Sequence, residues 1–152
     1  MKNNLFSFAP VIVLSLPRMA KRLIALLVDM SLSIFTVWLS FYLRLGEFIS
    51  ISGLNFWLVK PFLYASLISI ILAIPVFLMF GLYRAIFRYS GLSAMIGVLR
   101  AIGVYSILFS LIITVMGISG VPRTIGFIQP LLLFFAIGGS RAFARFWLGG
   151  TY

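Results

Sequence analysis

The chain contains no cysteine and no histidine, and its acidic residues are limited to Asp29 and Glu47. Without cysteine, disulfide bonds and thiolate chemistry are excluded. Thiolate, imidazole and carboxylate groups are the usual protein ligands of metal ions, and Asp29 is the one such group inside the apolar segments. We therefore expect no metal site in this chain.

The chain has many more apolar residues and many fewer charged residues than a soluble protein. Of the 152 residues, 63% are hydrophobic and 9% are charged. Charged residues make up roughly a quarter of a typical soluble domain. A folded soluble domain of this size could not bury so much apolar surface. The composition predicts a membrane protein.

The twelve lysines and arginines give the chain a formal net charge of +10. In a soluble protein this charge would suggest binding to nucleic acid. Here the basic residues lie at the ends of apolar segments, and they do not form a stripe that could follow a phosphate backbone. We therefore expect membrane lipids as partners and no nucleic acid.

Residues 1–22 precede the first long apolar segment. The run from Leu5 to Pro17 is too short to cross a hydrocarbon core of about 30 Å. A signal peptide is the competing interpretation, but the basic "RMAKR" follows and no cleavage site is visible. We interpret residues 1–22 as an interfacial segment that Arg18, Lys21 and Arg22 hold at the membrane surface.

Four apolar segments follow, each close to the roughly 20 residues that a membrane-spanning helix needs. Their lengths favour helices, because strands of a membrane barrel alternate over about ten residues. The predicted fold is all-α, a polytopic four-helix membrane bundle over residues 23–148, with Pro75 and Pro130 kinking two of the helices. The predicted spans are about 23–43, 61–83, 98–118 and 124–148. We expect residues 149–152 to begin a further, cytoplasmic part.

The distribution of basic residues predicts the orientation. Nine lie before the first span, between the second and third, or after the fourth, whereas three lie on the other side. Cytoplasmic segments carry the excess of lysine and arginine, so both termini of this multi-pass protein are predicted to be cytoplasmic. The nine are Lys2, Arg18, Lys21, Arg22, Arg84, Arg88, Arg100, Arg141 and Arg145, and the three are Arg44, Lys60 and Arg123.

Small and polar residues recur at helical spacing in three spans, and such faces let helices approach closely in lipid. We expect these faces to meet in the bundle interior. They comprise Asp29, Ser33, Thr36 and Ser40 in the first span, Ser66, Ser69 and Ala73 in the second, and Gly103, Ser106, Ser110 and Gly117 in the third.

Asp29 needs a partner, because a carboxylate inside a membrane is costly. Arg100 enters the membrane from the same side, at the beginning of the third span. We predict a structural intramembrane pair between Asp29 and Arg100. The functional alternative is a proton- or cation-coupling site at Asp29.

Arg84 and Arg88 lie in the connection "GLYRAIFRYSG" between the second and third spans. They are four residues apart, so on a helix they would share a face and could contact one lipid headgroup phosphate. We interpret them first as topology signals and second as candidate headgroup contacts. Gly138 and Gly139 lack the context of a dinucleotide turn or a P-loop, and we expect them to mark a close packing point.

Several short strings, in this order and spacing, carry a family resemblance: Pro17-Arg18, Asp29, Leu43-Arg44, Gly81-Leu82-Tyr83-Arg84, Val121-Pro122-Arg123 and Gly139-Ser140-Arg141. Over nearly its whole length the chain resembles the N-terminal membrane region of bacterial polysaccharide-biosynthesis nucleotide-sugar epimerases/dehydratases. These are the membrane-bound, CapD-like relatives of enzymes that act on UDP-N-acetylglucosamine.

The resemblance implies a multi-pass protein of the bacterial inner (cytoplasmic) membrane, with a membrane-anchoring role beside a fused or separate cytoplasmic catalytic domain. In that family, NAD belongs to the catalytic 4,6-dehydratase/epimerase domain, whose motifs are not found in residues 1–152. The resemblance therefore brings no catalytic and no cofactor-binding residue to this chain, which by itself is expected to be non-catalytic.

Three other functions remain open at this point. The chain could be the membrane region of a polyprenyl-phosphate sugar phosphotransferase, a small four-helix transporter using Asp29, or a structural or assembly subunit with no enzyme attached. Whether it forms a homo-oligomer is also open.

Overall fold

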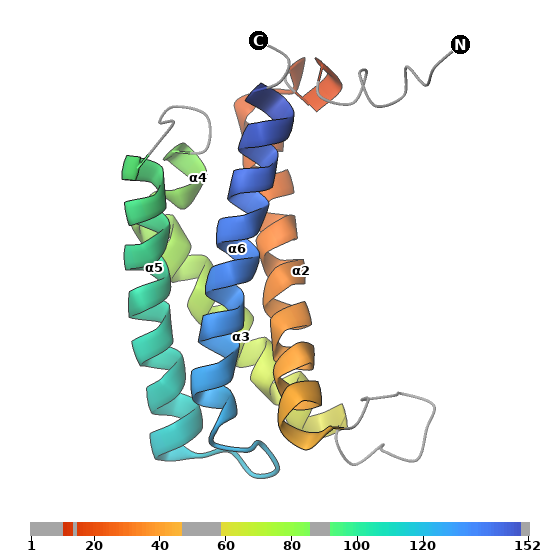
Figure 1. Ribbon diagram of the computed structural model, residues 1–152, viewed down its shortest axis with the longest axis vertical. Helices are drawn as coiled ribbons and strands as arrows, with labels where there is room; N and C mark the ends of the chain where they lie inside the picture. Colours follow the sequence, from red (N-terminus) through yellow and green to blue (C-terminus); the bar gives the residue numbers. More distant parts are fainter. Residues whose placement is uncertain (1–10, 14, 47–58, 86–91, 150–152) are drawn as a thin grey trace, which may run out of the picture.

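Helices make up the regular structure of the described residues, which are 11–13, 15–46, 59–85 and 92–149 of the computed structural model (Figure 1). Four helices are long and apolar enough to cross a membrane. This confirms the all-α fold with four candidate spans and supports a multi-pass membrane protein. In chain order the elements are α2 (Arg18–Leu45), α3 (Val59–Met79), the short α4 (Leu82–Ala85), α5 (Leu92–Ser110), which a π-helical stretch (Leu111–Met116) extends, and α6 (Ile125–Gly149).

The first helix begins earlier than the sequence predicted. Pro17 precedes it with an extended backbone, and the N–H of Lys21 donates to the Pro17 carbonyl at 3.2 Å. The basic cluster at residues 18–22 therefore belongs to the start of α2, so this helix begins inside the segment that we interpreted as interfacial. Residues 1–10 and 14 of that predicted segment lie outside the described residues. The helix ends at Gly46, whose φ of 70° allows its N–H to bond the Tyr42 carbonyl at 2.8 Å.

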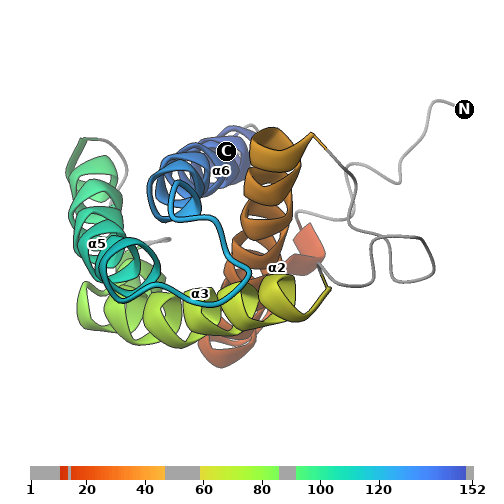
Figure 2. The ribbon, with the colours of Figure 1, turned by 90° about the horizontal axis from the view of Figure 1, so that it is seen from below.

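The four long helices form a ring in the order α2, α3, α5, α6. Each of α2 and α5 packs against both α3 and α6, so α2 and α5 lie across the ring from each other (Figure 2). α3 runs obliquely across the others, and α2 begins at the end of the bundle where α6 finishes (Figure 1). The turn between the π-helical stretch and α6 lies at the opposite end.

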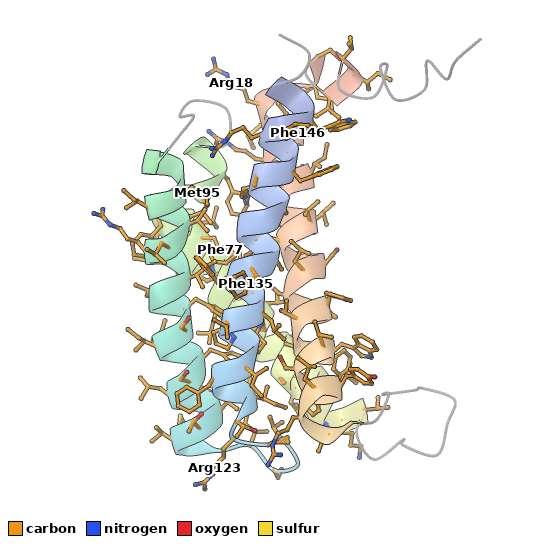
Figure 3. The ribbon with its side chains drawn as sticks, in the orientation of Figure 1. Arg18, Phe77, Met95, Arg123, Phe135 and Phe146 are labelled. Carbon is orange, nitrogen blue, oxygen red and sulfur yellow. The ribbon has the colours of Figure 1, made fainter. Side chains whose placement is uncertain are left out.

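Apolar side chains fill the interior and also cover the outside. Phe41, Phe77, Tyr105 and Phe109 are fully buried between the helices. Large apolar side chains also point outward along every span, and Phe135 is 65% exposed and Phe146 84% exposed (Figure 3). In water such a surface would be strongly unfavourable, whereas hydrocarbon is its natural surrounding.

Pro130 lies inside α6, and the sequence provides a replacement for the hydrogen bond that it removes. Proline has no N–H, so the carbonyl four residues earlier, at Gly126, loses its usual helical donor. The hydroxyl of Ser110 on α5 donates to that carbonyl at 2.6 Å. In a membrane such substitution by a serine of a neighbouring helix is how proline is accommodated.

The close packing point lies at Gly126 and not at the predicted Gly138 and Gly139. A Cβ on Gly126 would collide with the Thr114 hydroxyl and would lie 3.4 Å from Cβ of Ile113. A Cβ on Gly138 or Gly139 would meet no atom within 4 Å. The prediction was wrong because these two glycines do not lie on the packed face of α6.

Candidate functional site

Two polar clusters lie inside the described part of the bundle, and the larger one joins all four long helices. It consists of Thr36 on α2, Ser69 on α3, Tyr105 on α5 and Gln129 on α6, all of them buried. The Tyr105 hydroxyl donates to Gln129 Oε1 at 2.8 Å and lies 2.7 Å from the Ser69 hydroxyl. Gln129 Nε2 donates to Thr36 Oγ1 at 3.1 Å and to Ser69 Oγ at 3.3 Å.

The hydrogen-bonding capacity of this central network is used within the protein. Since Tyr105 donates to Gln129, the Ser69 hydroxyl is the donor to Tyr105, and it accepts in turn from Gln129. Thr36 accepts from Gln129 and donates to the Ser33 carbonyl at 2.9 Å. Each of the four side chains thus both donates and accepts a hydrogen bond. Buried polar groups stabilise a core when their hydrogen bonds are satisfied in this way. The network holds the four helices together.

The second cluster, called the end cluster below, consists of Asp29, Tyr83 and Arg141. It lies nearer the end of the bundle where α6 finishes. Arg141 Nη2 donates to Asp29 Oδ2 at 2.6 Å, and the carboxylate is only 3% exposed. The guanidinium carbon of Arg141 lies 5.8 Å from the centre of the Tyr83 ring, a distance at which a cation is attracted to the ring face. The end cluster therefore connects α2, α4 and α6.

Asp29 is paired as expected, but with Arg141 and not with the predicted Arg100. Arg100 lies exposed on the outer surface of α5. The physical reason is the order of the helices in the ring, because α6 adjoins α2 whereas α5 lies across from it. Since the carboxylate already has a guanidinium as counter-charge, a transported cation would have to compete with Arg141.

The end cluster, unlike the central network, retains unused hydrogen-bonding atoms. Asp29 Oδ1, Tyr83 Oη and Arg141 Nε are all buried, and the structure gives none of them a hydrogen-bond partner. Burial raises the pKa of the Tyr83 phenol well above its ordinary value, and the nearby Asp29 carboxylate raises this pKa further. The phenol is therefore protonated at neutral pH, and its hydroxyl can donate to the Asp29 carboxylate beside it.

The sequence predicted that three faces of small and polar residues lie in the bundle interior. Those of the first two spans are buried as expected, from Asp29 to Ser40 and from Ser66 to Ala73. The third is confirmed only in part, because Gly103 is exposed and the fully buried face of α5 comprises Ala101, Tyr105 and Phe109. Ser110 of the predicted face is half-buried and does contact α6.

Two residues of the central network, Tyr105 and Gln129, were missed. Tyr105 looks like an interfacial aromatic residue in the sequence, and Gln129 is a single amide beside a proline. The signal that could have identified Gln129 is that an amide within a span needs partners on neighbouring helices.

The candidate headgroup contacts are not tested by the structure. Arg88 lies outside the described residues, and Arg84 belongs to α4 but its side chain is not described. In the described part of the chain, no group of three or more histidine, cysteine, aspartate or glutamate side chains is placed to hold a metal ion. Comparison with protein-family models, with curated proteins and with solved structures gives no match for this chain.

Proposed function

We propose that the chain is a non-catalytic membrane-anchoring domain for a nucleotide-sugar epimerase/dehydratase of bacterial polysaccharide biosynthesis. The observation that carries the proposal is the central network, in which Thr36, Ser69, Tyr105 and Gln129 use their polar groups to join four helices. Such an interior provides a rigid support. The four side chains of this network bond one another, so a passing solute would have to break these bonds to bind there.

The direction of α6 supports the same proposal. α2 begins and α6 finishes at one end of the bundle (Figure 1). Basic residues lie near both of these helix ends, with Arg18 and Lys21 at the start of α2 and Arg145 near the end of α6. A catalytic domain that followed α6, or that bound to this end, would be held at one membrane surface. By the distribution of charge, this surface is the cytoplasmic one, where nucleotide sugars are present.

Copurification tests the proposal. The tagged chain is extracted from its own host in mild detergent, and the purified material is incubated with UDP-N-acetylglucosamine and NAD. We expect formation of a 4-keto-6-deoxy sugar nucleotide by a domain linked to the chain or bound to it. The same purification from cells with the untagged chain is the control.

The alternatives give different results in the same material. Transfer of a sugar phosphate to polyprenyl phosphate would support a phosphotransferase membrane region. Solute uptake into vesicles that is lost in Asp29→Asn would support a transporter. Absence of dehydratase and epimerase activity from material that contains all stably bound proteins would contradict the anchoring proposal.

A further inference from the structure

Arg100 is a charged side chain on the outer surface of the bundle. It lies inside the candidate span Met95–Met116, and it is exposed. The exposed residues around it on α5 are apolar, among them Ile96, Leu99 and Val104. A charge inside a span usually faces the bundle interior or a polar partner, because hydrocarbon does not solvate it. Arg100 faces outward instead.

The described part of the chain offers Arg100 no counter-charge. The structure gives its guanidinium no hydrogen bond and no ion pair there. Asp29 is the one acidic residue of that part, and its carboxylate is paired with Arg141. Glu47, the other acid of the sequence, lies outside the described residues, after the end of α2. An anion for Arg100 is therefore to be sought outside the described bundle.

The direction of α5 brings the guanidinium toward a layer of lipid headgroups. α5 begins toward the end of the bundle where α2 begins (Figure 1). Arg100 follows Met95, the first residue of the span, by about 7–8 Å along the axis at 1.5 Å per residue. The Cα–Cβ bonds of a helix are directed toward its N-terminus, here toward that end of the bundle. Long arginine side chains near the end of a span extend in this way to the membrane surface.

Two glycines leave room beside Arg100. Gly97 and Gly103 lie one turn before and after it, so the three residues share a face of α5. A Cβ at either glycine would meet no atom within 4 Å, so the described part of the chain leaves both positions open. A helical side chain covers the turn N-terminal to its own Cα, which is the turn of Gly97. This glycine leaves a path for the guanidinium toward the headgroups, and Gly103 leaves space deeper in the membrane.

We propose that Arg100 is the binding site of an anionic glycerophospholipid. The phosphate of the lipid accepts hydrogen bonds from the guanidinium, whose planar fork of N–H donors can bond two oxygens of one phosphate. One negative charge on the phosphodiester neutralises the one positive charge. An acyl chain of the same lipid packs along Gly103 and the exposed Ile107.

The depth of Arg100 favours a lipid over a helix of a partner protein. At the edge of a span the phosphate layer lies within reach of an arginine side chain. A partner helix would instead need a carboxylate inside its own span, which is costly. The inference is independent of the anchoring function, since it concerns the outer surface of α5.

Native mass spectrometry of the full chain in a neutral detergent tests the site with phosphatidylglycerol. Arg100→Met should raise the Kd of the first bound phosphatidylglycerol by about fivefold, the effect expected for one basic residue at an anionic lipid surface. Arg123→Met is the matched control, because it removes the same charge from an exposed position in the turn before α6, and it should leave this Kd nearly unchanged. Equal effects of the two variants would show general attraction between a basic protein and anionic lipid, and would overturn the proposal.

Phosphatidylcholine, which is zwitterionic, tests the requirement for an anionic lipid. We expect the unmodified chain and Arg100→Met to bind it equally. A loss in Arg100→Met as large as that for phosphatidylglycerol would contradict this requirement.

Gly97→Leu separates the geometry from the charge. The leucine side chain blocks the path of the guanidinium while Arg100 is retained, so the Kd for phosphatidylglycerol should rise as in Arg100→Met. Gly139→Leu is its control, because this exposed glycine of α6 also has open space at its Cβ position. Unchanged binding in a folded Gly97→Leu variant would contradict the site. If that variant does not fold, the comparison of Arg100→Met with Arg123→Met decides alone.

A partner helix would give a different result. Material extracted from native membranes would then contain a protein that Arg100→Met loses, and phosphatidylglycerol would bind the variant and the unmodified chain equally. This combination would overturn the lipid site.

Discussion

At the scale of single residues, the ion pair between Asp29 and Arg141 is the interaction most sensitive to substitution. Arg141→Met keeps much of the side-chain volume but leaves the Asp29 carboxylate buried without a counter-charge. Breaking a buried pair in this way typically costs about 3–5 kcal/mol. We expect the free energy of unfolding of the Arg141→Met variant, measured by denaturant titration in detergent, to fall by an amount of that order.

Arg100→Met is the matched control for this experiment. It removes the same charge from an exposed position on α5, and we expect almost no change in the free energy of unfolding. If Arg100→Met were as destabilising as Arg141→Met, Asp29 would have Arg100 as its partner, as the sequence had predicted.

The sequence predicted that Asp29 lies inside the bundle, but it did not identify its partner. Helical spacing places Asp29 on one face with Ser33, Thr36 and Ser40, and that face is buried. Arg100 and Arg141 both belong to spans that reach the same end of the bundle, so position along the membrane does not distinguish them. Which of the two arginines pairs with Asp29 depends on which helix lies next to α2. The order of the helices around the bundle results from the packing of all four, and the sequence of a single segment does not determine it.

At the scale of helices, Ser110 and Pro130 form a coupled pair on α5 and α6. The Ser110 hydroxyl supplies the donor that Pro130 withholds from the Gly126 carbonyl. Ser110→Ala should therefore lower the free energy of unfolding by about 1 kcal/mol, the usual value for one hydrogen bond. In a Pro130→Ala background the helix has its own N–H donor again, and we expect the effect of Ser110→Ala to be much smaller. A double-mutant cycle in detergent measures the difference.

Equal effects of Ser110→Ala in the two backgrounds would contradict the coupling. They would mean that Ser110 contributes through packing alone.

Glycine substitutions on α6 test the packing of the same two helices. Gly126→Ala should be clearly destabilising, because the added methyl group collides with Thr114 on the π-helical stretch. Gly139→Ala should be neutral or slightly stabilising, because that position is exposed and alanine favours helix. Thermal unfolding of the two variants measures both effects. The opposite order would move the close contact to Gly139, where the sequence had predicted it.

These glycines show why the sequence predicted the helices more reliably than their contacts. Long apolar segments between basic residues define spans, because length and hydropathy are properties of each segment alone. Gly126 and Gly139 look alike in the sequence, and their roles differ only through the rotation of α6 in the ring. Gln129 was missed for the same reason, since its partners lie on three other helices.

At the scale of the whole molecule, the uneven distribution of basic residues between the two ends of the bundle predicts its orientation in the membrane. Among the basic residues of the described part, Arg18, Lys21, Arg22 and Arg145 lie toward the end where α2 begins and α6 finishes. Three others lie toward the opposite end, namely Arg44, Lys60 and Arg123 (Figure 3 labels Arg18 and Arg123). The membrane potential acts on each charge with about 2.3 kcal/mol per 100 mV. The basic end should therefore face the cytoplasm.

Because the chain has no cysteine, single introduced cysteines report this orientation without background. Met19→Cys and Ser119→Cys place exposed thiols near the start of α2 and in the turn before α6, and neither removes a basic residue. In cells stripped of their outer membrane, a membrane-impermeant maleimide should label Cys at 119 at once. It should label Cys at 19 only after permeabilisation. The reverse pattern would show the opposite orientation, and any catalytic domain continuing from α6 would then lie outside the cytoplasm, away from nucleotide sugars and NAD. The same result would therefore contradict the proposed anchoring function.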